Sequence, residues 1–288
     1  MDLDSINFAS SPDSPDIVSG DLRPLDITVA CNTSRDLTRG HIETNIQRGF
    51  AEIVPLPENA RHLVIVGGGP SLKTNWREII WWVQSQGADV MALNGAAKFL
   101  NEQGFTPTFQ LVIDPRDNRH LIGEAGDYLI ASQVDPVTLD NLPQERTALL
   151  HLIGSCLKEG EMIDGKPIVG SIVAGTLIGG DVTAGLVALC TAHTLGYRQL
   201  HLYGYDSSYE NDEHHAYPQE QTDQEQKRLE VFAKDASGEM KRFTTNYAMA
   251  KQAELFPKTA ELLCNAGSEM TIHGTGLLPT IAHAMRKQ

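Results

Sequence analysis

The stretch Arg61-His-Leu-Val-Ile-Val-Gly-Gly-Gly-Pro-Ser-Leu72 decides the fold. Its apolar run, residues 63–66, is typical of a strand that is covered on both faces. The three glycines that follow allow a tight turn and a close approach of the backbone to a ligand. Pro70 suits the first position of a helix, where its missing N–H costs nothing. The stretch therefore predicts a strand, a turn that accepts a phosphate and the start of a helix.

Three glycines alone fit an ordinary strand-to-helix turn equally well, so the type of ligand needs separate tests. A dinucleotide fingerprint requires a third glycine at the position of Leu72 and an acidic residue after the next strand, which instead ends at Asn94. A Walker loop requires Gly-Lys-Ser/Thr, and Lys73 follows Ser71-Leu72 without that pattern. We therefore expect a nucleotide site that is neither an NAD site nor a P-loop.

Length and composition indicate one large α/β domain with extensions. A chain of 288 residues can bury a good core, and 41% hydrophobic with 21% charged residues is typical of soluble globular proteins. No apolar run approaches the length of a membrane span. Residues 1–20 lack the basic start and apolar segment of a signal peptide. These features predict a cytoplasmic protein without a membrane span.

Charge and cysteine content restrict the partners. A net charge of −14 disfavours a nucleic-acid backbone as a general partner. The cysteines are far apart in the sequence and show neither the paired spacing of a zinc site nor a disulfide framework; they are Cys31, Cys156, Cys190 and Cys264. We expect these cysteines to be reduced. The sequence is compatible with a homo-oligomer and with a monomer.

From Arg61 onwards, apolar strands alternate with helices. The expected strands are residues 63–66, 89–94, 109–114, 128–132, 147–153, 199–205 and 270–273, and the expected helices are 76–86, a short one ending near 103, 181–195 and 245–263. Regular alternation implies parallel strands joined by right-handed crossovers. The predicted fold class is therefore α/β, a Rossmann-like open, mostly parallel sheet with helices on both faces. Residues 228–243 add a predicted hairpin, and a helical extension ends the chain.

The predicted organisation has two parts. Residues 1–60 form an N-terminal extension, in which about the first 22 are expected to be disordered, 25–30 to form an early strand and 38–50 a short amphipathic helix. Residues 61–288 form the nucleotide-binding transferase domain. Within it, the glycine-rich residues 165–180 predict a loop or small hairpin, and the polar residues 207–227 predict a lid or a simple excursion.

Small or ligand-capable residues follow several of these strands. Each alone is more typical of a turn or a helix cap. In open parallel sheets, however, ligands bind beyond the carboxyl ends of the strands, so together they predict one site. The predicted nucleotide-binding residues are Gly67, Gly68, Gly69, Pro70, Ser71, Asn94, Gly95, Asp114, Gly154, Ser155, Gly204 and Tyr205.

The candidate catalytic residues are His214, His215 and Asp206. Exposed histidines are often solvated and have no catalytic role. A histidine in a loop above the site would instead serve as a general base or acid. The spacing does not choose between His214 and His215. Asp114 and Asp206 would hold Mg²⁺ against a pyrophosphate, or else cap helices. The sequence contains no His/Cys cluster at ligand spacing and no Gly-x-Ser-x-Gly elbow, which disfavours zinc and esterase chemistry.

These residues resemble a known family. Residues 66–72, the Asn94-Gly-Ala turn, the Asp114 strand end and residues 188–206 resemble the family once called domain of unknown function 115, also labelled 6-hydroxymethylpterin diphosphokinase-like. It spans flagellin-modifying motility accessory factors, archaeal pterin diphosphokinases and many bacteriophage proteins. The resemblance covers roughly residues 61–278, and residues 43–46 and 214–218 look like the phage branch.

The layout is also similar to that of bacterial CMP-sialic-acid-dependent sialyltransferases. The resemblance implies nucleotide contacts from residues 68–71 and Asn94, and a base at His214 or His215. The tyrosine pair that assists the departing phosphate in those enzymes has no clear match here, which argues against sialyl transfer itself.

The first functional hypothesis is a nucleotide-dependent transferase that moves a sugar from a nucleotide-activated donor to an unidentified acceptor. The alternative is pyrophosphate transfer from ATP with Mg²⁺ to a hydroxymethyl group, as in 6-hydroxymethylpterin diphosphokinases. A third hypothesis is a nucleotide-binding protein without catalysis. If the chain comes from a phage, the expected location is the host cytoplasm.

Overall fold

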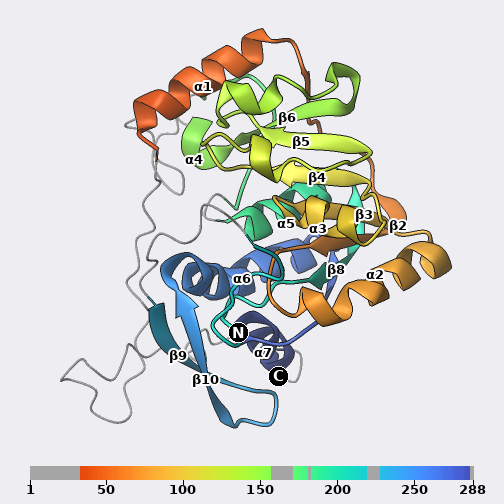
Figure 1. The fold of residues 1–288 in the computed structure, drawn as a ribbon, viewed down its shortest axis with the longest axis vertical. Coiled ribbons are helices and arrows are strands. Elements are labelled where there is room, and N and C mark those ends of the chain that lie inside the picture. The colour runs from red at the N-terminus through yellow and green to blue at the C-terminus, as the bar shows by residue number, and fades with distance from the viewer. Residues whose placement is uncertain (1–32, 157–170, 181–182, 219–227, 286–288) are drawn as a thin grey trace.

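Strand β2 (Asn59–Val66) lies inside a parallel sheet, and its last four residues are completely buried. The computed structural model describes residues 33–156, 171–180, 183–218 and 228–285. Within them the strand order is β1-β6-β5-β4-β3-β2-β8-β11, with β7 beside β6. Figure 1 shows the central strands from β6 to β2 and β8. Every pairing in this sheet is parallel, which confirms the predicted Rossmann-like architecture.

The strands predicted from residue 61 onwards all occur, with small shifts at their ends. Besides β2, the sheet contains β1 (Ala51–Glu52), β3 (Asp89–Leu93), β4 (Phe109–Val112), β5 (Asp127–Ala131), β6 (Thr147–Leu152), β7 (Leu177–Ile178), β8 (Tyr197–Tyr203) and β11 (Glu269–Ile272). The described helices are α1 (Arg35–Gln47), α2 (Leu72–Gln86), α3 (Ala96–Glu102), α4 (Ile153–Cys156), α5 (Ala184–Thr194), α6 (Tyr247–Asn265) and α7 (Leu277–Met285), together with short 3₁₀ turns. None of these helices is long and apolar enough to cross a membrane.

Strand β2 contributes to a separate core on each face of the sheet. Leu63 and Ile65 belong to the core that includes α5, α6 and α7. Val64 and Val66 point to the other face and pack with α2 and α3. Because successive side chains of a strand alternate between faces, a strand buried on both sides must be apolar throughout. This explains why the run at residues 63–66 is uninterrupted.

The N-terminal segment, where it is described, contacts the sheet. Strand β1 pairs in parallel with β6, at the edge of the sheet. In α1, the Asn45 amide donates hydrogen bonds to the backbone oxygens of Ser132 (3.0 Å) and Val134 (2.8 Å). The predicted disordered segment and the predicted strand at residues 25–30 lie outside the described residues.

The C-terminal prediction is also confirmed. Strands β9 (Arg228–Lys234) and β10 (Met240–Asn246) form an antiparallel hairpin beside the main sheet (Figure 1). The Asp235 carboxylate closes its turn by accepting from the backbone N–H groups of Ser237 (2.8 Å) and Glu239 (3.1 Å). The glycine-rich segment is described only from residue 171, and its strand β7 pairs in parallel with β6. The described part is therefore a loop with a short parallel strand and not a hairpin.

A histidine cluster lies between α2 and strands β2, β8 and β11. Nδ1 of His62 and Nε2 of His201 are 3.0 Å apart, and the Trp82 ring stacks on His201. Burial, together with the nearby His62 and His273, lowers the pKa of His201 to about 4. His201 is therefore neutral in the folded protein at neutral pH.

The free energy of unfolding should fall as the pH is lowered from about 6.5, the usual pKa of histidine in an unfolded chain, towards 4. In this window the unfolded chain binds a proton at His201 and the folded chain does not, so protonation favours unfolding. Urea unfolding of the native chain and of His201→Gln between pH 7 and pH 4 measures the effect. We expect a shallower pH dependence in the variant, and equal slopes would contradict the assignment.

Candidate functional site

Strands β2 and β8 are neighbours at the point where the strand order reverses direction. From β2 the chain builds outward to β6, and after α5 it returns to β8 on the other side of β2. Ligands of open α/β sheets bind in the crevice at such a point. Here the backbone N–H groups of Gly67 and Gly69 donate to the carbonyl oxygens of Tyr203 (2.8 Å) and Gly204 (2.9 Å). The two strand-end turns are therefore joined directly by their backbones.

The close contact between these two turns explains why residues 67–69 are glycines. A Cβ atom on Gly67 would lie 2.6 Å from the Gly204 oxygen, and one on Gly69 would lie 1.9 Å from Oδ2 of Asp206. None of the glycines 67–69 has a positive φ. They are required because the neighbouring chain approaches closely, and not because of an unusual backbone conformation.

The side chain of Asp206 lies at the N-terminus of α2. Its carboxylate accepts hydrogen bonds from the backbone N–H (3.3 Å) and the hydroxyl (3.0 Å) of Ser71. Burial raises the pKa of Asp206 to about 6, against the opposing effect of the Ser71 hydrogen bonds. The N–H groups of Gly67, Gly69 and Ser71 thus all donate to groups of the protein itself, and a carboxylate lies where the sequence predicted a phosphate.

A cavity of about 320 Å³ lies next to this junction. The predicted site residues that line it are Gly67, Gly68, Gly69, Asn94, Asp114, Gly204, Tyr205, His214 and His215. Those that do not line it are Pro70, Ser71, Gly95, Gly154, Ser155 and Asp206. Gly154 and Ser155 belong to α4, which follows β6, four strands away from β2 in the sheet.

Asn94 is a strained residue in the wall of this cavity. Its φ is +49°, a left-handed conformation that asparagine tolerates better than most residues. Its carbonyl oxygen accepts a hydrogen bond of 2.8 Å from Nε2 of Gln110. Its side-chain Oδ1 is buried and has no hydrogen-bond partner among the described residues. A buried acceptor of this kind needs a donor, which a ligand hydroxyl or amine would supply.

Two helices begin at the cavity. Thr183 caps α5 by accepting from the N–H of Leu186 (3.4 Å), and Asn246 caps α6 by accepting from the N–H of Met249 (2.9 Å). The capping residues and parts of the first turns of both helices line the cavity. Because helix N-termini carry a partial positive charge, this part of the cavity favours an anion.

His215 is fixed by the glycine turn. Its Nδ1 lies 3.2 Å from the carbonyl oxygen of Gly68, which also accepts from the backbone N–H of Ala216 (2.8 Å). A carbonyl oxygen only accepts, so Nδ1 carries the proton and Nε2 of the neutral ring is an acceptor. Burial, together with the neighbouring His214, lowers the pKa of His215 to about 4. The ring is therefore neutral at neutral pH, with a defined basic nitrogen.

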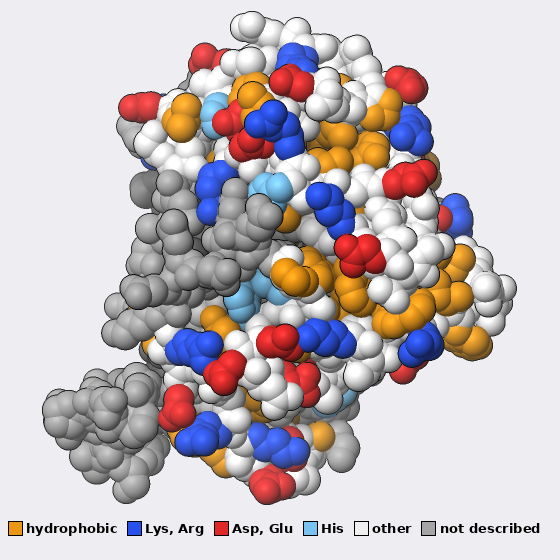
Figure 2. Space-filling view, in the orientation of Figure 1, with side chains coloured by type: hydrophobic (Ala, Val, Ile, Leu, Met, Phe, Trp, Pro, Cys, Tyr) orange, Lys and Arg blue, Asp and Glu red, His pale blue; other side chains and the backbone are white. Residues whose placement is uncertain are grey.

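The loop that contains both histidines is anchored at several points. Lys73 pairs with Glu213, and Arg228 pairs with Asp212. Residues Ser207, Asn211 and Asp212 have positive φ values of 51°, 49° and 66°. Strained residues persist only where the surrounding structure holds them, so this loop has a specified shape. Histidine side chains are visible near the centre of the face in Figure 2.

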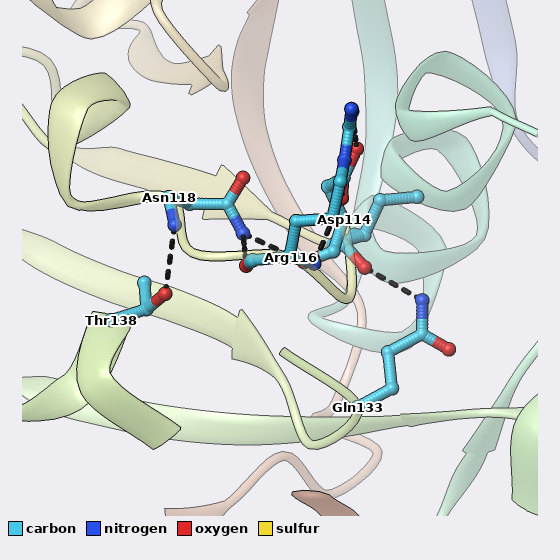
Figure 3. Close-up of polar contacts among 6 residues, drawn as sticks. Asp114, Arg116, Asn118, Gln133 and Thr138 are labelled. Carbon is cyan, nitrogen blue, oxygen red and sulfur yellow. Dashed lines mark hydrogen bonds and ion pairs between the residues drawn. The ribbon is translucent and has the colours of Figure 1, made fainter. Parts of the chain in front are cut away.

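The wall after β4 contains Asp114, whose carboxylate accepts from the backbone N–H (2.9 Å) and from Nε (2.8 Å) of Arg116 (Figure 3). Asp206 faces Ser71 and not the cavity. The two carboxylates predicted to share Mg²⁺ therefore each have a protein partner, and only Asp114 lines the cavity. In the described part of the chain no group of three or more His, Cys, Asp and Glu residues is arranged to hold a metal ion.

Sequence reasoning missed several lining residues, among them Arg116, His120, Thr183, Tyr217, Asn246 and Gln252. Thr183 and Asn246 each stand directly before a helix, in residue types that prefer the N-cap position. That local signal identifies them as caps. Their place at the cavity results from the packing of α5 and α6, which no local pattern shows.

Two solved structures were compared with this fold. The fold is similar to that of the MAf glycosyltransferase from Magnetospirillum magneticum AMB-1, with a TM-score of 0.50 and 16% identity over 90% of this chain. The chain spans only 42% of that protein. A mammalian sialyltransferase aligns with a TM-score of 0.36 and 11% identity, over 86% of this chain and 81% of the other. At such identities the likeness to the MAf enzyme shows the fold alone.

No curated protein matches the sequence. Residues 40–212, more than half of the chain, match the family described as 6-hydroxymethylpterin diphosphokinase MptE-like. The match confirms the resemblance seen in the glycine turn and the strand ends, whereas membership of a phage branch stays a prediction. The chain belongs to the 6-hydroxymethylpterin diphosphokinase MptE-like family.

Proposed function

We propose that this protein is a nucleotide-dependent transferase that moves a sugar from a nucleotide-activated donor to a hydroxyl group of an acceptor. The observation that carries the proposal is the neutral ring of His215, whose Nδ1 is held by the Gly68 carbonyl and whose Nε2 is an acceptor. The same cavity receives the N-termini of α5 and α6. A base and an anion-stabilising region are the two elements that such a transfer requires.

In the proposed step, Nε2 of His215 accepts the proton of the acceptor hydroxyl as its oxygen attacks the anomeric carbon of the donor sugar. The bond between that carbon and the phosphate oxygen breaks, and the phosphate leaves with the electron pair. The first-turn N–H groups of α5 and α6 stabilise the negative charge that develops on the leaving phosphate. Asn94 Oδ1 accepts a hydrogen bond from the nucleotide.

Family membership supports transferase chemistry in general, because the family is named after a diphosphokinase. It also favours a second candidate, the transfer of pyrophosphate from ATP with Mg²⁺. A base at the acceptor hydroxyl serves both reactions. In the second reaction Mg²⁺ would lie near Asp114, the one of the two predicted carboxylates that lines the cavity. The nucleotide that binds therefore separates the candidates.

We expect the melting temperature of the full chain to rise in the presence of CMP, CDP or UDP without added metal, because a ligand that binds only the folded state stabilises it. A thermal-shift panel of CMP, CDP, UDP, GDP, AMP and ATP, each with and without Mg²⁺, is the measurement. Stabilisation by ATP only with Mg²⁺ would favour pyrophosphate transfer instead. The absence of any response would exclude both, and binding without turnover on any acceptor would support a non-catalytic nucleotide-binding protein.

A further inference from the structure

Amide side chains hold the cavity wall formed by residues 113–121. Nδ2 of Asn118, which is fully buried, donates to the carbonyl oxygens of Asp114 (2.7 Å) and Arg116 (2.6 Å) (Figure 3). Nε2 of Gln133 donates to the carbonyl oxygen of Ile113 (2.6 Å). Side-chain amides thus satisfy the backbone carbonyl oxygens of Ile113, Asp114 and Arg116, which fixes the path of this loop.

A second buried amide ties this wall to the end of β3. Nε2 of Gln110, also fully buried, donates to the carbonyl oxygens of Asn94 (2.8 Å) and Leu121 (2.9 Å). Its Oε1 accepts from the backbone N–H of Gly123 (3.1 Å). All its hydrogen-bonding atoms are used to join two walls of the cavity. Such supporting bonds are typical of positions where a side chain must be held in a defined orientation.

The side chain that this wall holds is Arg116. Its Nε and Nη2 donate to Oδ1 (2.8 Å) and Oδ2 (2.5 Å) of Asp114, which fixes the plane of the guanidinium group. Figure 3 shows both side chains standing up together from the loop. Arg116 is 39% exposed, and among the described residues that line the cavity it is the only lysine or arginine. Asp114 is the only acidic one.

We propose that Arg116 is an anion-binding residue of this cavity, with Asp114 as its competing internal partner. The bound group is an oxyanion of the substrate, either a phosphate of the nucleotide or a carboxylate of the transferred sugar. The proposal rests on the proposed function, since it names the group that the same cavity recognises. An arginine whose plane is fixed offers a preformed site for a planar or tetrahedral oxyanion. Asp114 keeps the site neutral until such an anion arrives.

Substitution of Arg116, but not of Asp114, should weaken anion binding. Isothermal titration calorimetry of the full chain measures these affinities. The ligands are inorganic pyrophosphate, glucuronate, the nucleotide that stabilises the chain and the corresponding nucleoside. We expect Arg116→Gln to weaken the binding of the anion by about tenfold or more and to leave the nucleoside unaffected, because a charge-assisted hydrogen bond is lost. Asp114→Asn removes the competitor and should leave anion binding unchanged or tighter. Arg116→Lys should retain part of the affinity.

Equal weakening by Arg116→Gln and Asp114→Asn would show that the ion pair only shapes the wall, and would overturn the proposal. No effect of Arg116→Gln, or no binding of any anion by the native chain, would also overturn it. An effect on pyrophosphate identifies a phosphate, and an effect on glucuronate alone identifies a carboxylate. Pyrophosphate binding that depends on Arg116, without nucleotide binding, would retain this site and reject the proposed function. Nucleotide binding that Arg116→Gln leaves unchanged would reject this anion site and retain the proposed function.

Discussion

Replacement of His215 by asparagine is expected to lower the turnover number by about 10²- to 10⁴-fold, the usual contribution of a general base. Asparagine retains a donor at the position of Nδ1, so the hydrogen bond to the Gly68 carbonyl is preserved while the basic Nε2 is removed. Steady-state kinetics with the donor identified by thermal shift and a hydroxyl acceptor provide the measurement. The melting temperature should change little.

His214→Asn is the matched control for this variant, because the two rings are adjacent, with centroids 4.3 Å apart, and lie in the same loop. It changes the loop in the same way without removing Nε2 of His215, so its turnover should stay much closer to that of the native chain. Since the pKa of His215 is lowered to about 4, the native rate should also persist well below pH 6.5. Full turnover in His215→Asn would reject the base.

A Gly69→Ala substitution should lower the free energy of unfolding by about 2–4 kcal/mol, because overpacking and the loss of hydrogen bonds to a buried carboxylate each contribute a few kcal/mol at most. The added Cβ would lie 1.9 Å from Oδ2 of Asp206 and 2.7 Å from the Gly204 oxygen. Either the carboxylate leaves Ser71 or the β2 and β8 turns separate. Urea unfolding monitored by circular dichroism measures the change.

The matched control is Gly40→Ala. Gly40 lies inside α1, its φ is not positive and an added Cβ meets no atom within 4 Å. Alanine in a helix interior is favoured over glycine, so this variant should be slightly more stable than the native chain. If Gly69→Ala proved equally harmless, the two strand-end turns would not be in the close contact described here.

The fold could be predicted because its signals are local. A strand buried on both faces must be apolar at every position, and residues 63–66 show this without reference to anything else. The hairpin was recognisable because Asp235 and Gly238 are residues that a tight turn requires. Strand β1 was missed because it has only two residues, Ala51 and Glu52, and a pattern needs a longer run.

The candidate site was predictable only where it follows from a general rule. The rule that ligands bind at the carboxyl ends of parallel strands identified Gly68, Asn94 and Asp114, which the structure brings to one cavity. The rule does not say which way a side chain points. Asp206 turns to Ser71, and Arg116 reaches the cavity through a loop held by buried amides, because distant packing decides both.

The junction between the glycine turn and the end of β8 also determines when the site is completed during synthesis. Ser71 and Asp206 are separated by 135 positions in the sequence. A chain emerging from the ribosome carries the glycine turn long before β8 is available, and pairings between distant segments form slowly. The centre of the sheet can therefore be completed only after β8 has been synthesised. Until that strand is synthesised, the nascent chain has strands β2 to β6 but lacks the part of the cavity wall that Gly204 and Tyr205 form.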